Sequence, residues 1–186
     1  MVLALIMLMA SFAAALGGRA QLTVAHMALG LGRSGGLLLA GLATAALTAI
    51  AMAAAGAWLG GQASAGSQLL LVRGALVLAA ADLAWPVRIA APAEPTRSLG
   101  AITLVLAGRQ LFDAPRWLAF AGGAALAEGT PAGTPAAGGA AIGAGLAMLL
   151  GWLVPARVSE AATLRALRWA MGTGCLLAAL LIVYYS

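Results

Sequence analysis

Apolar residues run through this chain in long stretches that short polar or Gly/Pro-rich segments separate. A helix that crosses a ~30 Å hydrocarbon core needs about 20 apolar residues at ~1.5 Å each. Four stretches have this length without an internal interruption, and each predicts one membrane-spanning helix. They cover residues 37–59, 68–85, 136–154 and 159–185.

Two further apolar stretches are interrupted, and each is predicted to be a bent span. Residues 1–31 are too long for one straight crossing and break at Gly17-Gly18. Residues 98–125 break at 113–115, where Pro115 disfavours a continuous helix. Cleavage of a signal peptide near Ala15 is the alternative for the first stretch, but no basic residue precedes that apolar run. The pattern therefore predicts six spans.

The composition supports the membrane class and leaves little room for another. Of 186 residues, 63% are hydrophobic and 8% are charged, whereas a soluble domain carries about 25% charged residues. Disordered chains are charged and poor in apolar residues, so disorder is excluded as well. We expect one membrane domain over residues 1–186, with the lipid bilayer as its surroundings and no nucleic-acid partner. Cys175 is the only cysteine, so it forms no internal disulfide.

The basic residues are all arginines, and those in loops predict the orientation. They fall in the loops after the first, third and fifth spans, whereas loops 60–67 and 128–135 contain none. The positive-inside rule makes the arginine-bearing loops cytoplasmic and places both termini outside. We expect a multi-pass protein of the bacterial inner-membrane type. The loop arginines are Arg33, Arg88, Arg97 and Arg157.

The two interrupted stretches are separated by about half the chain and look alike. Each break is followed by an Ala/Leu-rich stretch and then by a span rich in small residues. The chain therefore divides into halves 1–86 and 98–186 around a linker at 87–97. Three spans in each half make the repeat inverted, as in many secondary transporters, and paired breaks point to a binding site at the midplane. GxxxG spacing predicts close helix packing at Gly56/Gly60 and Gly139/Gly143.

Charged side chains inside spans are costly and are functional candidates by default. Those near the two breaks are Arg19, Arg109, Asp113 and Arg116, together with polar Gln21 and Gln110. Asp113 has two interpretations: a structural ion pair with an arginine three or four residues away, or a cation or proton site. Two other charged residues, Asp82 and Arg168, are interpreted as markers of span ends, the arginine snorkelling toward water.

The sequences at the two breaks resemble a motif of a known protein family. Gly17, Arg19 and Gln21-Leu22 match parts of the motif E-x-G-D-[KR]-[TS], with Ala15, Gly18 and Ala20 at its Glu, Asp and Ser/Thr positions. In the second copy Asp113 is kept, while Gln110 and Phe112 replace the Glu and Gly. On these residues the chain resembles the six-span calcium/manganese–proton exchanger family, also called uncharacterised protein family 0016 or the transmembrane protein 165 family.

The resemblance implies a divalent cation/proton antiporter with all-α architecture and two inverted three-helix repeats. On this hypothesis Asp113 binds Mn²⁺ or Ca²⁺ or titrates, Gln21 and Gln110 donate oxygens, and Arg19 and Arg116 set the local charge. The family motif supplies four carboxylates and this chain supplies one, although a hard divalent cation prefers several oxygen ligands.

Two alternative functions remain beside the antiporter. One is a non-transporting paralogue with a structural or regulatory role on a membrane partner, in which Asp113 is locked to an arginine. The other is transport of an anion or a neutral solute, in which the retained arginines hold negative charge. An enzyme is not expected, because neither a His/acid metal cluster nor a G-x-S-x-G motif is present, and no cofactor is implied.

Overall fold

The computed structural model describes residues 1–87, 98–126, 134–156 and 162–184. Several sequence predictions fall outside these ranges. They are the linker from residue 88, most of the loop at 128–135, the loop arginines Arg88, Arg97 and Arg157, and the helix start at Ser159.

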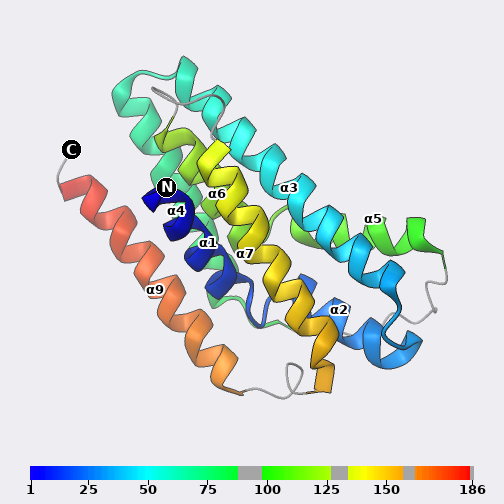
Figure 1. Cartoon of the computed structure of the whole chain (residues 1–186). Coiled ribbons are helices and arrows are strands. Elements are labelled where there is room, and N and C mark those ends of the chain that lie inside the picture. The colour runs from blue at the N-terminus through cyan, green and yellow to red at the C-terminus, as the bar shows by residue number, and fades with distance from the viewer. Residues whose placement is uncertain (88–97, 127–133, 157–161, 185–186) are drawn as a thin grey trace.

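Every regular element in the described ranges is an α-helix (Figure 1). In the part of the chain that the structure describes, four helices are long and apolar enough to cross a membrane: α3, α4, α7 and α9. A fifth span results if α1 and α2 are one span bent by 59°. The chain is thus an all-helical protein with the character of a multi-pass membrane protein. The helices are Val2–Ala15 (α1), Arg19–Leu31 (α2), Gly35–Gln62 (α3), Ala65–Ala84 (α4), Leu99–Gln110 (α5), Ala114–Ala125 (α6), Thr134–Leu153 (α7) and Ala162–Tyr184 (α9).

Serine caps set the starts of three helices. The side chains of Ser34, Ser64 and Ser98 each accept a hydrogen bond from a first-turn N–H, which satisfies one of the donors that a helix start leaves free. Helix α4 ends where the chain reaches Trp85-Pro86, because proline cannot continue the helical hydrogen bonds.

Both predicted breaks are present, and their local chemistry differs. Helix α1 ends at Ala15, Gly17 adopts φ +67°, and Gly18 is the extended residue that precedes α2. Such a positive φ strains residues with a side chain, so glycine suits this turn. In the second break α5 ends at Gln110, and Asp113 caps α6, with Pro115 in its first turn. At 12 residues each, neither α5 nor α6 spans a ~30 Å core alone.

The halves of the two broken helices pack unequally. Helix α1 lies along α7, and α6 lies against α3 and α4, in extensive contacts. Helices α2 and α5 make fewer contacts and lie toward the same end of the bundle (Figure 1). Helix α9 packs chiefly on α4. The breaks therefore separate a tightly packed end of the bundle from a looser one.

Glycines allow the close approaches at the tight end. A Cβ on Gly56 would meet the carbonyl oxygen of Phe120 on α6, and one on Gly123 would meet that of Ala53 on α3. Likewise Gly139 and Gly143 of α7 lie on the backbone of α1. The prediction of close packing at Gly56, Gly139 and Gly143 is confirmed, and small residues serve the same purpose here as in other membrane helices.

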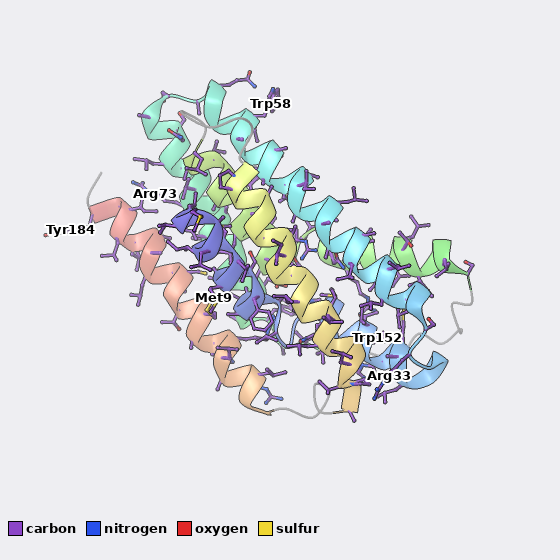
Figure 2. The ribbon with its side chains drawn as sticks, in the orientation of Figure 1. Met9, Arg33, Trp58, Arg73, Trp152 and Tyr184 are labelled. Carbon is purple, nitrogen blue, oxygen red and sulfur yellow. The ribbon has the colours of Figure 1, made fainter. Side chains whose placement is uncertain are left out.

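Large apolar side chains cover the outside of the bundle. Leu39 and Leu104 are both more than two-thirds exposed, as suits a surface that faces lipid rather than water. Trp58 and Tyr184 lie toward one end of the long helices, and Trp152 and Arg33 lie toward the other (Figure 2). Aromatic residues at both ends are typical of the two interfaces of a bilayer.

Candidate functional site

The predicted candidate Asp113 is neutralised by its own helix. As the N-cap of α6, its Oδ1 accepts a hydrogen bond from the backbone N–H of Arg116 at 3.2 Å. The Arg116 guanidinium turns back over this first turn, and its Nη1 lies 3.3 and 3.4 Å from the two carboxylate oxygens. Arg116 is completely buried. The ion-pair interpretation of Asp113 is therefore the one that the structure supports.

Arg116 also joins three helices through its remaining donors. Its Nη2 donates to Gln110 Oε1 at 2.6 Å, and its Nε donates to Thr48 Oγ1 at 2.8 Å. Gln110 in turn donates to Thr44 Oγ1 at 3.1 Å. Because these side chains are buried, each hydrogen bond is needed to offset the loss of water. This cluster ties α5 and α6 to α3 and is closed to solvent.

A second charged cluster lies beside the first, around Asp82 of α4. The Asp82 Oδ2 accepts a hydrogen bond from the backbone N–H of Ala114, in the first turn of α6, at 3.0 Å. Arg19 and Arg168 pair with the carboxylate at 3.4 and 3.8 Å. Arg168 also donates to the backbone oxygen of Asp82 at 2.6 Å. Asp82 thus supports the second helix break directly.

The expectation that the Arg168 side chain snorkels toward water is wrong, whereas Asp82 does lie in the last turn of α4. Arg168 is only 5% exposed and does not reach water. Packing of α4 between α6 and α9 places both residues at the break, which sequence position alone does not reveal. The sequence signal that marks them is their rarity, because charged residues inside apolar spans are functional candidates by default.

The other two predicted site residues, Gln21 and Arg19, make contacts outside the Arg116 cluster. Gln21 is completely buried; its Oε1 accepts from the Gly17 N–H at 2.7 Å, and its Nε2 donates to the Ala147 carbonyl on α7 at 2.9 Å. Arg19 belongs to the Asp82 cluster. The structure therefore brings Gln110, Asp113 and Arg116 together, and places Arg19 and Gln21 at the first break.

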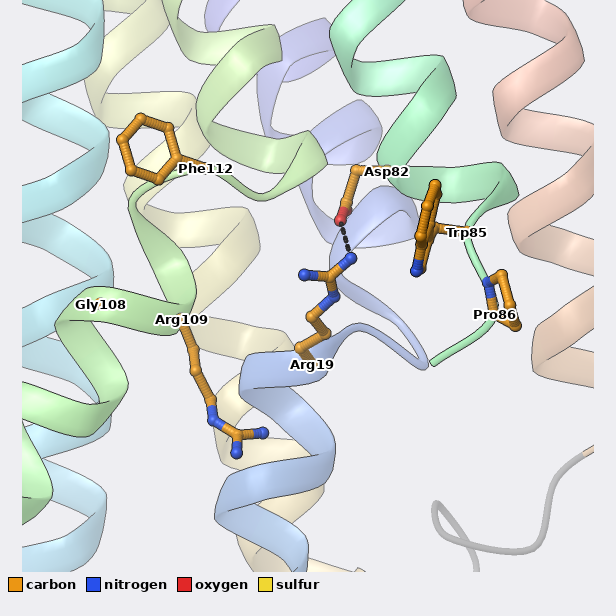
Figure 3. A pocket seen from close by; sticks show the side chains of 7 residues that line it. All are labelled: Arg19, Asp82, Trp85, Pro86, Gly108, Arg109 and Phe112. Carbon is orange, nitrogen blue, oxygen red and sulfur yellow. Dashed lines mark ion pairs between the residues drawn. The ribbon is translucent and has the colours of Figure 1, made fainter. Parts of the chain in front are cut away.

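A pocket of about 840 Å³ opens beside both breaks, between α2, α4 and α5. In Figure 3 the Arg19 side chain points to Asp82, and that of Arg109 lies on the opposite side of the opening. Arg109 donates to Thr23 Oγ1 at 3.0 Å and pairs with no carboxylate among the residues that the structure describes. The lining residues are Arg19, Asp82, Trp85, Pro86, Gly108, Arg109 and Phe112.

The charges around this pocket favour anions. Arg19 and Arg109 line it together with a single described carboxylate, Asp82, which already pairs with Arg19 and with the buried Arg168. Within the described ranges no three His, Cys, Asp or Glu side chains gather in a way that could hold a metal ion. A divalent cation here would meet no unpaired carboxylate, whereas an anion would meet excess positive charge.

No protein-family model, no curated protein and no solved structure matches this chain. The function of the site is therefore inferred from its own residues and their geometry.

Proposed function

We propose that this protein is a secondary transporter with six spans in two inverted halves, and that its cargo is a small anion. The architectural part of the proposal depends on the helix breaks. Residues 1–86 and 98–186 each begin with two short helices, α1–α2 and α5–α6, and continue with two long ones. If α5 and α6 cross the membrane as one bent span, each half has three spans and the second half is inverted.

We propose that the chain shares the fold of the family it resembles. The resemblance to the calcium/manganese–proton exchangers supports paired, interrupted helices at the centre of the bundle. It does not support the exchangers' cargo, because fold and site chemistry are separable. The motif position that carries Asp113 is used here to cap α6 and to bind Arg116.

The charge balance of the pocket is the observation that carries the anion assignment. Asp82 is shared by two arginines, Asp113 is held by a third, and Arg109 faces the pocket without a carboxylate partner in the described residues. A cation would have to enter against this field. A low-dielectric pocket with excess positive charge instead concentrates anions.

On this proposal the pocket opens to the cytoplasm. The pocket lies at the end of the bundle where α2 and α5 are loosely packed, and the positive-inside rule assigns that end to the cytoplasm. The opposite end is closed by the glycine contacts between α3 and α6 and between α1 and α7. On this proposal both termini face the outside of a bacterial-type inner membrane.

Uptake into proteoliposomes tests the proposal. We expect accumulation of at least one of lactate, succinate, phosphate and sulfate, and no protein-dependent movement of Mn²⁺ or Ca²⁺. Arg109→Gln should abolish the anion flux, because it removes the unpaired charge of the pocket. Arg165→Gln is the matched control, since Arg165 is exposed on α9 and does not line the pocket. Mn²⁺ or Ca²⁺ flux that requires Asp113 would contradict the anion assignment.

A second candidate function is the non-transporting paralogue. The observation that favours it is the Asp113–Arg116 pair, which locks the surviving motif carboxylate in a closed, buried cluster. This candidate predicts a folded protein that moves no anion or cation, and whose removal lowers the amount of a partner protein in the membrane. Anion flux that depends on Arg109 would reject it.

A further inference from the structure

The two half-helices that start at the breaks have unlike N-termini. Helix α6 begins with carboxylates: Asp113 accepts the N–H of Arg116, and Asp82 accepts the N–H of Ala114. Helix α2 begins at Gly18, which has no side chain, and no other side chain caps this end. A helix start leaves N–H groups without intrahelical partners and carries partial positive charge, so α2 presents an uncompensated N-terminus.

A buried cationic donor points at this same place. Arg168 is 5% exposed, and its Nη2 donates to Asp82, but its Nη1 is buried and has no hydrogen-bond partner among the described residues. The Nη1 lies 3.5 Å from the position that a Cβ on Gly18 would occupy. Buried polar groups normally find partners, so an orphan guanidinium nitrogen beside an uncapped helix start indicates a missing acceptor.

A comparison of the two helix breaks indicates what kind of acceptor fits there. Gly18 aligns with Asp113, whose carboxylate on α6 accepts a first-turn N–H and pairs with an arginine. We propose that the N-terminus of α2 is the binding site for the carboxylate group of the anionic cargo. The first-turn N–H groups of α2 and the Nη1 of Arg168 hold it where the chain has no carboxylate of its own. The assignment deepens the proposed anion transport and depends on it.

The pocket lies next to this site. Gly18 is partly exposed, and the neighbouring Arg19 is 44% exposed along its side chain and lines the pocket. The nearby negative group is the Asp82 carboxylate, which Arg19, Arg168 and the N–H of Ala114 already offset. A carboxylate at α2 would therefore meet a net positive surrounding, and Arg109 is a second arginine on the lining of the adjacent pocket.

A carboxylate placed at residue 18 tests the site in the full-length protein. Gly18 has φ −73° and ψ 162°, which aspartate adopts readily as an N-cap. We expect Gly18→Asp to raise the thermal unfolding midpoint in detergent and to remove the stabilisation that sodium formate gives the wild type, relative to sodium chloride at equal ionic strength. Gly18→Ala is the matched control, because its Cβ makes the same 3.0 Å contact with the Ala15 carbonyl oxygen and it has no side-chain oxygen to cap α2.

A second variant keeps the test independent of that substitution. Arg168→Gln retains a donor toward Asp82 and removes the orphan Nη1. We expect its affinity for ¹³C-formate, measured by ligand-observed NMR, to fall about tenfold or more, because a charge-assisted hydrogen bond is lost. Full formate binding by Gly18→Asp or by Arg168→Gln would overturn the site, as would absence of formate binding to the wild type.

The failure of the site and the failure of the proposed function give different results. If anion uptake persists in Gly18→Asp vesicles at the wild-type rate, transport stands and the α2 site is wrong. If formate binds the wild type as described but no anion is taken up and Mn²⁺ or Ca²⁺ is, the site is a binding site without the proposed transport. Loss of both binding and anion uptake in Gly18→Asp, with both kept in Gly18→Ala, supports the two together.

Discussion

At the scale of single residues, the arginines near the two helix breaks differ in role according to the side chains they bind. Arg116 is fully buried and uses its donors on Asp113, Gln110 and Thr48. The sequence identified Arg116 and Asp113 because charges are rare in apolar spans. It left open whether they pair, since that depends on where the helix breaks: Asp113 precedes α6 as a cap instead of lying within a continuous helix.

Arg116→Met is predicted to destabilise the protein by about 3–5 kcal/mol, because it leaves the Asp113 carboxylate buried without its cation. Addition of Asp113→Asn should recover much of this loss, since asparagine can still cap α6. Thermal or denaturant unfolding in detergent measures both variants. A double variant no more stable than Arg116→Met would show that the pair is not what holds this cluster.

At the scale of elements, the sequence located both helix breaks from the Gly17-Gly18 pair and from Pro115. It did not indicate that α1 and α6 pack tightly while α2 and α5 remain loose, because the two halves carry similar apolar patterns. That asymmetry follows from backbone contacts that only the three-dimensional arrangement shows, such as Gly56 of α3 on Phe120 of α6. It also brings Asp82 to the second break, where sequence position suggested a span end.

Gly56→Ala is predicted to lower the thermal unfolding midpoint, because its Cβ would collide with the backbone of α6. Gly74→Ala on α4 is the matched control: open space surrounds it, and alanine favours the helix by about 1 kcal/mol. Equal effects of the two substitutions would argue against a tightly packed interface between α3 and α6.

At the scale of the whole molecule, the composition was sufficient to predict an apolar helical bundle. The described charged residues lie only in part at helix connections. Arg33 is exposed at one, whereas Arg168 is buried and the Asp82 side chain is 12% exposed. The number of spans depends on whether α5 and α6 cross together, which their lengths alone do not decide. The sequence indicated an excess of arginine near the breaks, but it could not indicate which arginines line the pocket or which aspartates they meet.

Labelling of single cysteines tests the orientation in intact cells. In a Cys175→Ala background, Gln62→Cys between α3 and α4 should react with a membrane-impermeant maleimide added from outside. Gly35→Cys, exposed at the start of α3, should react only after permeabilisation. The expectation follows from the positive-inside rule. The opposite labelling pattern would invert the topology and turn the pocket to the outside.

The central claim is that the pocket between α2, α4 and α5 selects anions over cations. Anomalous diffraction from crystals soaked in bromide or in Mn²⁺ tests it most directly. The account predicts a bromide peak among Arg19, Arg109 and the N-terminus of α2, and no manganese peak in the pocket. A manganese peak on Asp113 or Asp82, without bromide, would contradict it.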